Sequence, residues 1–162
     1  MKKHACSLGF LLPVLLGILG CGGSSGQDAA PPLAIGSWQQ ARLLQGPQAV
    51  SMVNAMHPTS AAPAICWVGY YGGITVYGSR FQSPEQARSA YDAMKNGLGQ
   101  EKSGFTPAQP LTVAGQAGFH TTGVNKEHFF YVRGSWLIWV EGKAEDFAPT
   151  VRSMRWGKAA RS

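Results

Sequence analysis

Two stretches in the middle of the chain, mainly apolar and aromatic, are joined by a pair of glycines. Residues 64–71 and 74–81 are rich in aromatic and β-branched side chains, and Gly72-Gly73 stands between them. A two-residue glycine loop between two such runs is typical of a β-hairpin. The pattern therefore predicts two neighbouring antiparallel strands.

The second half of the chain contains further runs of this kind. Glycine-containing turns separate four further runs that suit strands, at residues 110–114, 117–122, 127–133 and 135–141. Strands joined by short turns pair in an antiparallel manner. Together with the central hairpin, these runs predict a mostly antiparallel sheet of about six strands.

The clearest helical pattern lies between the two groups of strands. Ser83 is placed to cap a helix, Pro84 suits the first helical position, and Gln86 completes a capping box. Apolar positions then recur at helical spacing, which predicts one buried face made of Ala87, Ala90, Tyr91, Met94 and Leu98.

Three shorter helices are also expected from the pattern. They cover residues 37–45, a segment that begins at Pro47 and ends before His57-Pro58, and residues 146–154. In the last of these, Pro149 suits only the first turn of the helix.

Helices segregated from hairpin-linked strands indicate the α+β class. We expect a single domain over residues 35–156, built as a curved, mostly antiparallel sheet with its helices packed on one face. Residues 157–162 form a short basic tail.

The first part of the chain has the pattern of an export signal. Lys2 and Lys3 precede an apolar run over residues 8–19, and small residues follow before Cys21. A helix that spans a bilayer needs about 20 apolar residues, so the run is too short for one.

The segment Ile18-Leu19-Gly20-Cys21 resembles the lipobox of bacterial lipoproteins. The resemblance implies cleavage between Gly20 and Cys21, a diacylglycerol on the Cys21 thiol and an acyl chain, such as palmitate, on its amino group. Residues 1–20 are then a signal peptide, and residues 21–34 are a lipidated cysteine with a flexible tether. The alternative is an ordinary secretory signal, with Cys21 a plain thiol.

Lipidation of Cys21 would place the chain in the cell envelope, held to a membrane by its acyl chains. Gly22 follows the cysteine where an inner-membrane lipoprotein of enteric bacteria carries Asp, so the outer membrane, facing the periplasm, is favoured over the inner membrane. Loss of Lys2 and Lys3 with the signal leaves 12 basic residues against 8 acidic ones. Their scattered positions do not suit nucleic-acid binding.

The third cysteine, Cys66, has no intramolecular partner once Cys6 is removed and Cys21 is lipidated. It lies among apolar residues of a predicted strand. This setting indicates a small buried side chain rather than a reactive thiol, which needs an electropositive neighbour.

Metal binding and catalysis have weak sequence support. His120 and His128 flank a predicted turn, and they share a face of the sheet only if the sum of paired residue numbers is even. They are weak candidates for a metal site, and the sequence predicts no metal and no cofactor. Glu141, Glu145 and Asp146 suit a strand end and a helix N-terminus better than a catalytic pair, so we assign no catalytic residue.

Aromatic side chains are the more suggestive feature. Phe129, Tyr131, Trp136 and Trp139 lie on two neighbouring predicted strands, and alternation sends the two tryptophans to opposite faces. One interpretation is a pair of central strands covered on both sides. The other is an open face that binds a cell-wall glycan, an acyl chain or a partner protein.

A second resemblance covers residues 50–156. It is carried by Met56-His57 and by TVYGSRF, PEQARSAYDAM, FTPAQPLTVAG and HFFYVRGSWLIW. These segments are similar to a pattern in uncharacterised bacterial envelope proteins, and the similarity implies one α+β domain without an assigned activity. The sequence thus favours a lipid-anchored binding or interaction module with an unknown ligand. A structural or stress-related lipoprotein is the alternative, and a hydrolase or metal-dependent enzyme is the least favoured.

Overall fold

The computed structural model describes residues 28–56 and 62–157. The expected signal peptide with Gly20, the lipidation site Cys21 and most of the basic tail lie outside the described residues. The predictions for those segments therefore remain predictions.

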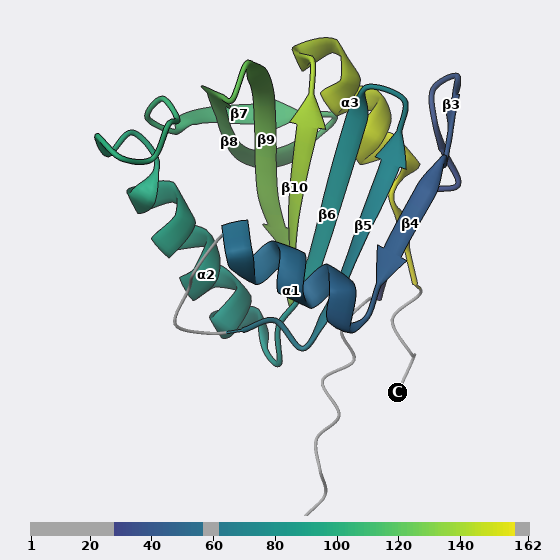
Figure 1. Cartoon of the computed structure of the whole chain (residues 1–162), viewed down its shortest axis with the longest axis horizontal. Helices are drawn as coiled ribbons and strands as arrows, with labels where there is room; N and C mark the ends of the chain where they lie inside the picture. Colours follow the sequence, from purple (N-terminus) through teal and green to yellow (C-terminus); the bar gives the residue numbers. More distant parts are fainter. Residues whose placement is uncertain (1–27, 57–61, 158–162) are drawn as a thin grey trace, which may run out of the picture.

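A seven-stranded antiparallel sheet is the centre of the described fold (Figure 1). The sheet is open, and its strands follow the order β4-β5-β6-β10-β9-β8-β7. Their bounds are β4 (Arg42–Gln45), β5 (Ile65–Tyr71), β6 (Ile74–Arg80), β7 (Gln109–Val113), β8 (Gln116–Gly123), β9 (Lys126–Arg133) and β10 (Trp136–Gly142). The six predicted strands are confirmed.

Two short strand pairs complete the described fold. β1 (Ala29–Ala30) pairs with β11 (Arg155–Trp156), and β2 (Ala34–Ile35) pairs with β3 (Trp38–Gln39). Ala29 is buried, and the Trp67 indole donates a hydrogen bond to its carbonyl oxygen. The packed part of the chain therefore begins earlier than residue 35, inside the segment expected to be a tether.

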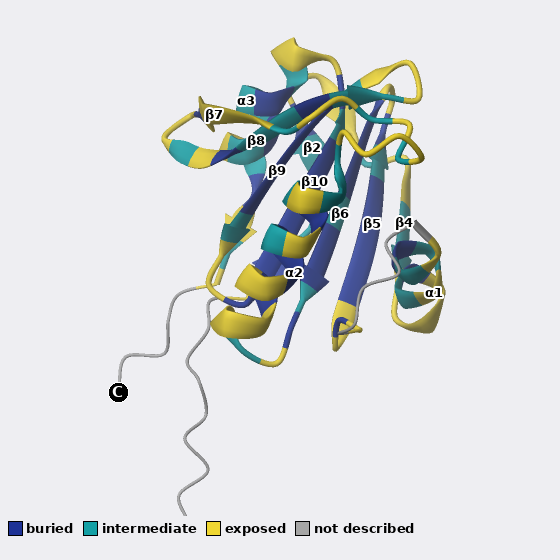
Figure 2. Cartoon of the chain, turned by 90° about the vertical axis from the view of Figure 1, so that its left-hand side faces the viewer, coloured by how far each residue is buried: buried dark blue, intermediate teal, exposed yellow. Residues whose placement is uncertain are grey.

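The three described helices cover both faces of the sheet, so the prediction that they share one face is not confirmed. α1 (Pro47–Met56) and α2 (Pro84–Gly97) pack on one face, here called the α1/α2 face, where they contact Cys66 and Leu137 respectively. α3 (Ala144–Ser153) packs on the opposite face, the α3 face, through Phe147. Aromatic and β-branched side chains on both sides of the central strands require this double cover. Figure 2 shows those strands as the most buried part of the molecule.

The local signals around α2 act as expected. The Ser83 hydroxyl accepts the Gln86 amide at 3.3 Å, and Pro84 is the first helical residue. The Gln86 side chain in turn accepts the Gln82 amide. The helix buries four of the five residues expected on its inner face, Ala87, Ala90, Tyr91 and Met94, and the fifth, Leu98, is partly buried beside them.

The helix predicted over residues 37–45 is wrong. This segment forms β3 and β4, and β4 supplies the seventh strand of the sheet by pairing with β5. Leu43 packs against the cluster on the α3 face and Leu44 against the one on the α1/α2 face. In a strand, adjacent residues point to opposite faces of the sheet, so both leucines are covered. A helix packed on the sheet would bury only the side chains on its inner face.

The last helix begins at Ala144, two residues earlier than predicted, and Pro149 therefore lies in its second turn. Proline cannot donate the bond that a helix expects there. The N-terminus is held by Asp146, whose carboxylate accepts the Lys143 amide at 3.0 Å. This contact confirms a helix-capping position for Asp146.

Candidate functional site

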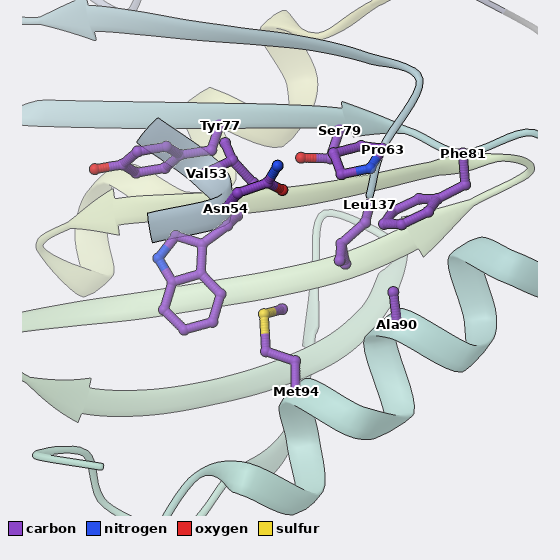
Figure 3. Close-up of a pocket in the computed structure, with 10 residues that line it drawn as sticks. Val53, Asn54, Pro63, Tyr77, Ser79, Phe81, Ala90, Met94 and Leu137 are labelled. Atoms are coloured by element: carbon purple, nitrogen blue, oxygen red, sulfur yellow. The ribbon is translucent and has the colours of Figure 1, made fainter. Parts of the chain in front are cut away.

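Two adjoining cavities on the α1/α2 face share Tyr77 and Trp139, and we call them together the Tyr77–Trp139 site. The inner cavity lies between α1, α2 and the sheet and has a volume of about 30 Å³ (Figure 3). The outer cavity opens beside the β9–β10 end of the sheet and measures about 400 Å³. The other lining residues of the inner cavity are Val53, Asn54, Pro63, Ser79, Phe81, Ala90, Met94 and Leu137. Those of the outer cavity are Phe105, Val124, Lys126, His128 and Glu141.

Strand register places the two shared residues side by side. Trp139 on β10 pairs directly with Tyr77 on β6, so both side chains point to the α1/α2 face. One step along this face, Leu137 pairs with Ser79, and in the other direction Glu141 pairs with Thr75. The site therefore runs along the junction of β6 and β10, from an apolar end near Leu137 to a polar end at Glu141.

The polar end contains a chain of three paired side chains. The Tyr77 hydroxyl donates to Glu141 Oε2 at 3.4 Å, and Lys126 Nζ forms an ion pair with Glu141 Oε1. Burial, followed by the charge of Glu141, raises the pKa of Tyr77 well above its ordinary value. Tyr77 therefore stays a neutral hydrogen-bond donor over the physiological pH range.

His128 forms the back of the outer cavity in a fixed tautomer. The Trp139 indole N–H lies 3.0 Å from His128 Nδ1, and His128 Nε2 lies 3.0 Å from the Gly123 carbonyl oxygen. An indole can only donate and a carbonyl can only accept, so Nδ1 is the acceptor and Nε2 carries the proton. The ring of Phe105 packs edge-on against His128 with its centroid 5.1 Å away.

Acid is expected to destabilise the fold through His128. Burial lowers the pKa of this ring below its ordinary value of 6.5, although the hydrogen bond to Gly123 and the charge of Glu141 act in the opposite direction. Between the folded and unfolded pKa values the unfolded chain binds more protons, so the free energy of unfolding falls as the pH drops below about 6.5. Urea unfolding at neutral and acid pH measures this loss.

The control compares two histidine variants. His128→Gln removes the titrating ring and is expected to flatten the pH dependence below pH 6.5. His120→Gln changes a partly exposed ring on the α3 face, outside both cavities, and tests whether loss of any histidine has the same effect. Equal pH dependence in the two variants would show that His128 is not the group responsible.

The rim of the outer cavity is strained. Val124 and Asn125 form the turn between β8 and β9 with φ angles of 52° and 60°. Asparagine suits this left-handed region, but a β-branched residue there is a true outlier. The Val124 side chain is also 76% exposed while it lines the cavity. Backbone strain of this kind clusters at binding sites.

The aromatic residues considered for an open binding face are core residues. Phe129, Tyr131 and Trp136 point to the α3 face and Trp139 to the α1/α2 face, and all four are at most 6% exposed. The interpretation with both faces covered therefore describes them. Trp139 alone of the four lines the Tyr77–Trp139 site.

The two histidines do not share a face. In the β8–β9 register, His120 pairs with Phe129 and Thr121 pairs with His128, so the sum of paired numbers is odd. His120 points to the α3 face and His128 to the α1/α2 face, and the two rings cannot bind one ion together. Over residues 28–56 and 62–157, no group of three or more His, Cys, Asp or Glu side chains is placed to hold a metal ion.

Cys66 is buried, and its Sγ lies 3.6 Å from Ser79 Oγ. Burial raises the pKa of the thiol, and the Ser79 contact opposes that shift only in part. The interpretation of Cys66 as a small buried side chain is confirmed.

Sequence reasoning missed Tyr77, Phe105 and Lys126 as site residues. Tyr77 lies on a predicted strand and Lys126 in the turn expected before another, but nothing in the sequence indicates that β6 pairs with β10. Phe105 lies in the loop after α2, and its ring occupies the space that a side chain at Gly123 would fill. Glycine at position 123 was interpreted only as a turn signal.

The chain matches no protein-family model, no curated protein and no solved structure. No helix in the described part of the chain is long and apolar enough to cross a membrane.

Proposed function

We propose that this protein is a lipid-anchored binding protein of the bacterial cell envelope, and that the Tyr77–Trp139 site binds a small, mainly apolar ligand. The observation that carries the binding proposal is the pair of adjoining cavities along the β6–β10 junction. Apolar concave sites with a few convergent polar groups are the usual form of small-molecule sites. The lipobox resemblance around Cys21 supports the anchor.

The pairing of the polar groups favours binding over catalysis. Glu141 is held by Tyr77 and Lys126, and His128 is held between Trp139 and Gly123. A general base or nucleophile must be available to a substrate atom. Polar groups that are already paired suit recognition of a ligand. The apolar part of the ligand would lie over Trp139, and its polar part would form hydrogen bonds with Tyr77, Glu141 or Lys126.

Val124→Asn separates ligand binding from stability. Asparagine tolerates the left-handed backbone, so we expect it to relieve about 1 kcal/mol of strain. The same change removes an apolar wall of the outer cavity, which should weaken an apolar ligand about tenfold. The measurement is saturation of N-phenyl-1-naphthylamine fluorescence on the purified protein, alongside thermal unfolding.

Ala114→Asn is the matched control. Ala114 has a φ angle of 50° in the turn between β7 and β8, outside both cavities. It should stabilise the fold in a similar way and leave probe binding unchanged. The proposal that the Tyr77–Trp139 site binds the ligand would be wrong if the wild-type protein showed no saturable probe binding. It would also be wrong if the Val124→Asn and Ala114→Asn proteins bound the probe equally well.

A further inference from the structure

Arginine side chains gather at one end of the sheet, where the acidic residues are Asp28, which pairs with Arg80, and Glu85 and Asp92 beside Arg88 on α2. Arg80 ends β6 and Arg133 ends β9, and both lie in one row with the first residue of β10, Trp136. The opposite end, where β9 begins and β10 stops, carries four acidic residues against two lysines among the described residues: Glu127, Glu141, Glu145 and Asp146 against Lys126 and Lys143.

Both ends of the described chain meet at the arginine-bearing end. The Gly157 amide donates to the Asp28 carbonyl oxygen at 2.7 Å, and the Asp28 carboxylate pairs with Arg80 at 3.0 Å. Beyond Gly157 the sequence adds two more cations, Lys158 and Arg161.

The arginines at this end are presented in a form that suits an anionic surface. The Arg133 guanidinium stacks over the Trp156 ring at 4.6 Å, and Arg155 donates to the Pro31 carbonyl oxygen. Within residues 28–56 and 62–157, neither of these arginines forms an ion pair with a carboxylate. Ile65, which pairs with Arg80 in the same row, is 45% exposed.

We propose that this end, the arginine end formed by Arg80, Arg133 and Arg155 with Ile65, docks on the anionic phospholipid surface of the membrane. The phosphate groups of the lipids accept hydrogen bonds from the guanidinium groups. Ile65 contacts the interface between headgroups and acyl chains. The acidic end then points away from the bilayer and avoids repulsion by its negative charge.

The choice of a lipid surface rests on where the chain emerges, and to that extent on the proposed anchor. Cys21 precedes Asp28 by seven residues, which span at most about 25 Å when fully extended. Acyl chains on Cys21 would hold the arginine end within that distance of the bilayer. At physiological salt the Debye length is about 8 Å, so the electrostatic attraction acts only when the tether brings the arginine end close to the surface.

The test uses the mature chain with Cys21→Ser, which has no acyl group, so its result does not depend on lipidation. We expect it to sediment with phosphatidylcholine vesicles that contain about one third phosphatidylglycerol, and not with vesicles of pure phosphatidylcholine. Added salt should release the bound protein. Each arginine near an anionic surface contributes about fivefold to the partition coefficient. Arg133→Gln with Arg155→Gln should therefore weaken binding about 25-fold.

Two further double variants keep the result interpretable. Lys102→Gln with Lys143→Gln removes the same net charge from positions remote from the arginine end and should leave binding nearly unchanged. Arg133→Lys with Arg155→Lys keeps the charge and should restore most of the binding, which excludes simple misfolding as the cause of a loss. Equal binding to neutral vesicles, or equal loss in the two charge-removing variants, would overturn the proposal.

A chain that binds purified anionic wall polymer but not anionic vesicles would also overturn it, and would assign the arginine end to that polymer. Failure of vesicle binding leaves the Tyr77–Trp139 site untouched, because probe binding there is measured without membranes. Failure of the anchor is distinguished by the absence of acyl mass on Cys21 in the wild-type protein.

Discussion

Trp136→Ala is expected to lower the free energy of unfolding by about 3–5 kcal/mol. The Trp136 side chain is 3% exposed on the α3 face, in the same cluster as Trp67 and Tyr131. Its indole nitrogen has no hydrogen-bond partner in the described part of the chain, so the substitution gives up packing and no hydrogen bond. The loss is the transfer free energy of a large aromatic ring plus the cost of the cavity that remains.

Urea unfolding measures this effect, with Trp38→Ala as the control. Trp38 is 50% exposed and covers Gly72 at the sheet's hairpin turn, so its removal leaves no enclosed cavity. We expect its effect to be below about 1.5 kcal/mol, because much of the ring is already in water. A Trp136→Ala protein as stable as the wild type would mean that the indole lies outside the core.

Cys21→Ser is expected to abolish membrane attachment through the lipid anchor. Serine lacks the thiol that the diacylglycerol would modify, and the lipobox resemblance implies that modification precedes cleavage after Gly20. The variant should accumulate as an uncleaved precursor without acyl mass. Intact mass spectrometry of protein extracted from membranes checks both features.

Cys66→Ser serves as the matched cysteine control. Cys66 is buried in β5 and lies outside the lipobox segment, so its replacement should alter stability and leave lipidation intact. A cleaved Cys21→Ser protein that still carries acyl mass would contradict the anchor. A wild-type chain cleaved near Gly20 with an unmodified thiol would instead support an ordinary secretory signal.

Local signals predicted most of the secondary structure. The Gly72-Gly73 turn and the capping of α2 by Ser83 depend on residues within a few positions of one another, so a single sequence contains the information. The segment at Leu43 and Leu44 misled the prediction because its helical appearance is overridden by the edge of β5, which offers unpaired backbone groups. That edge exists only in the folded sheet.

The candidate site depended on information that the sequence does not contain. His128 could be placed on a face only once the β8–β9 register was known, and a shift of one residue would have reversed the answer. Trp139 was identified as a large apolar residue, but its partner Tyr77 lies on a strand separated from β10 by α2 and three strands. Aromatic composition alone cannot distinguish a buried core from an open face.

The junction of β6 and β10 also bears on the order in which the protein becomes functional. Among the described strands of the sheet, every other neighbouring pair is consecutive along the chain, and only β6 and β10 join distant segments. Within the sheet, closing that junction demands the largest loss of chain entropy, so we expect it to form after the hairpins on either side of it. Since Tyr77 and Trp139 face each other across it, a ligand would bind only the finished sheet. By mass action, a bound ligand would then stabilise the junction that joins the two halves of the sheet.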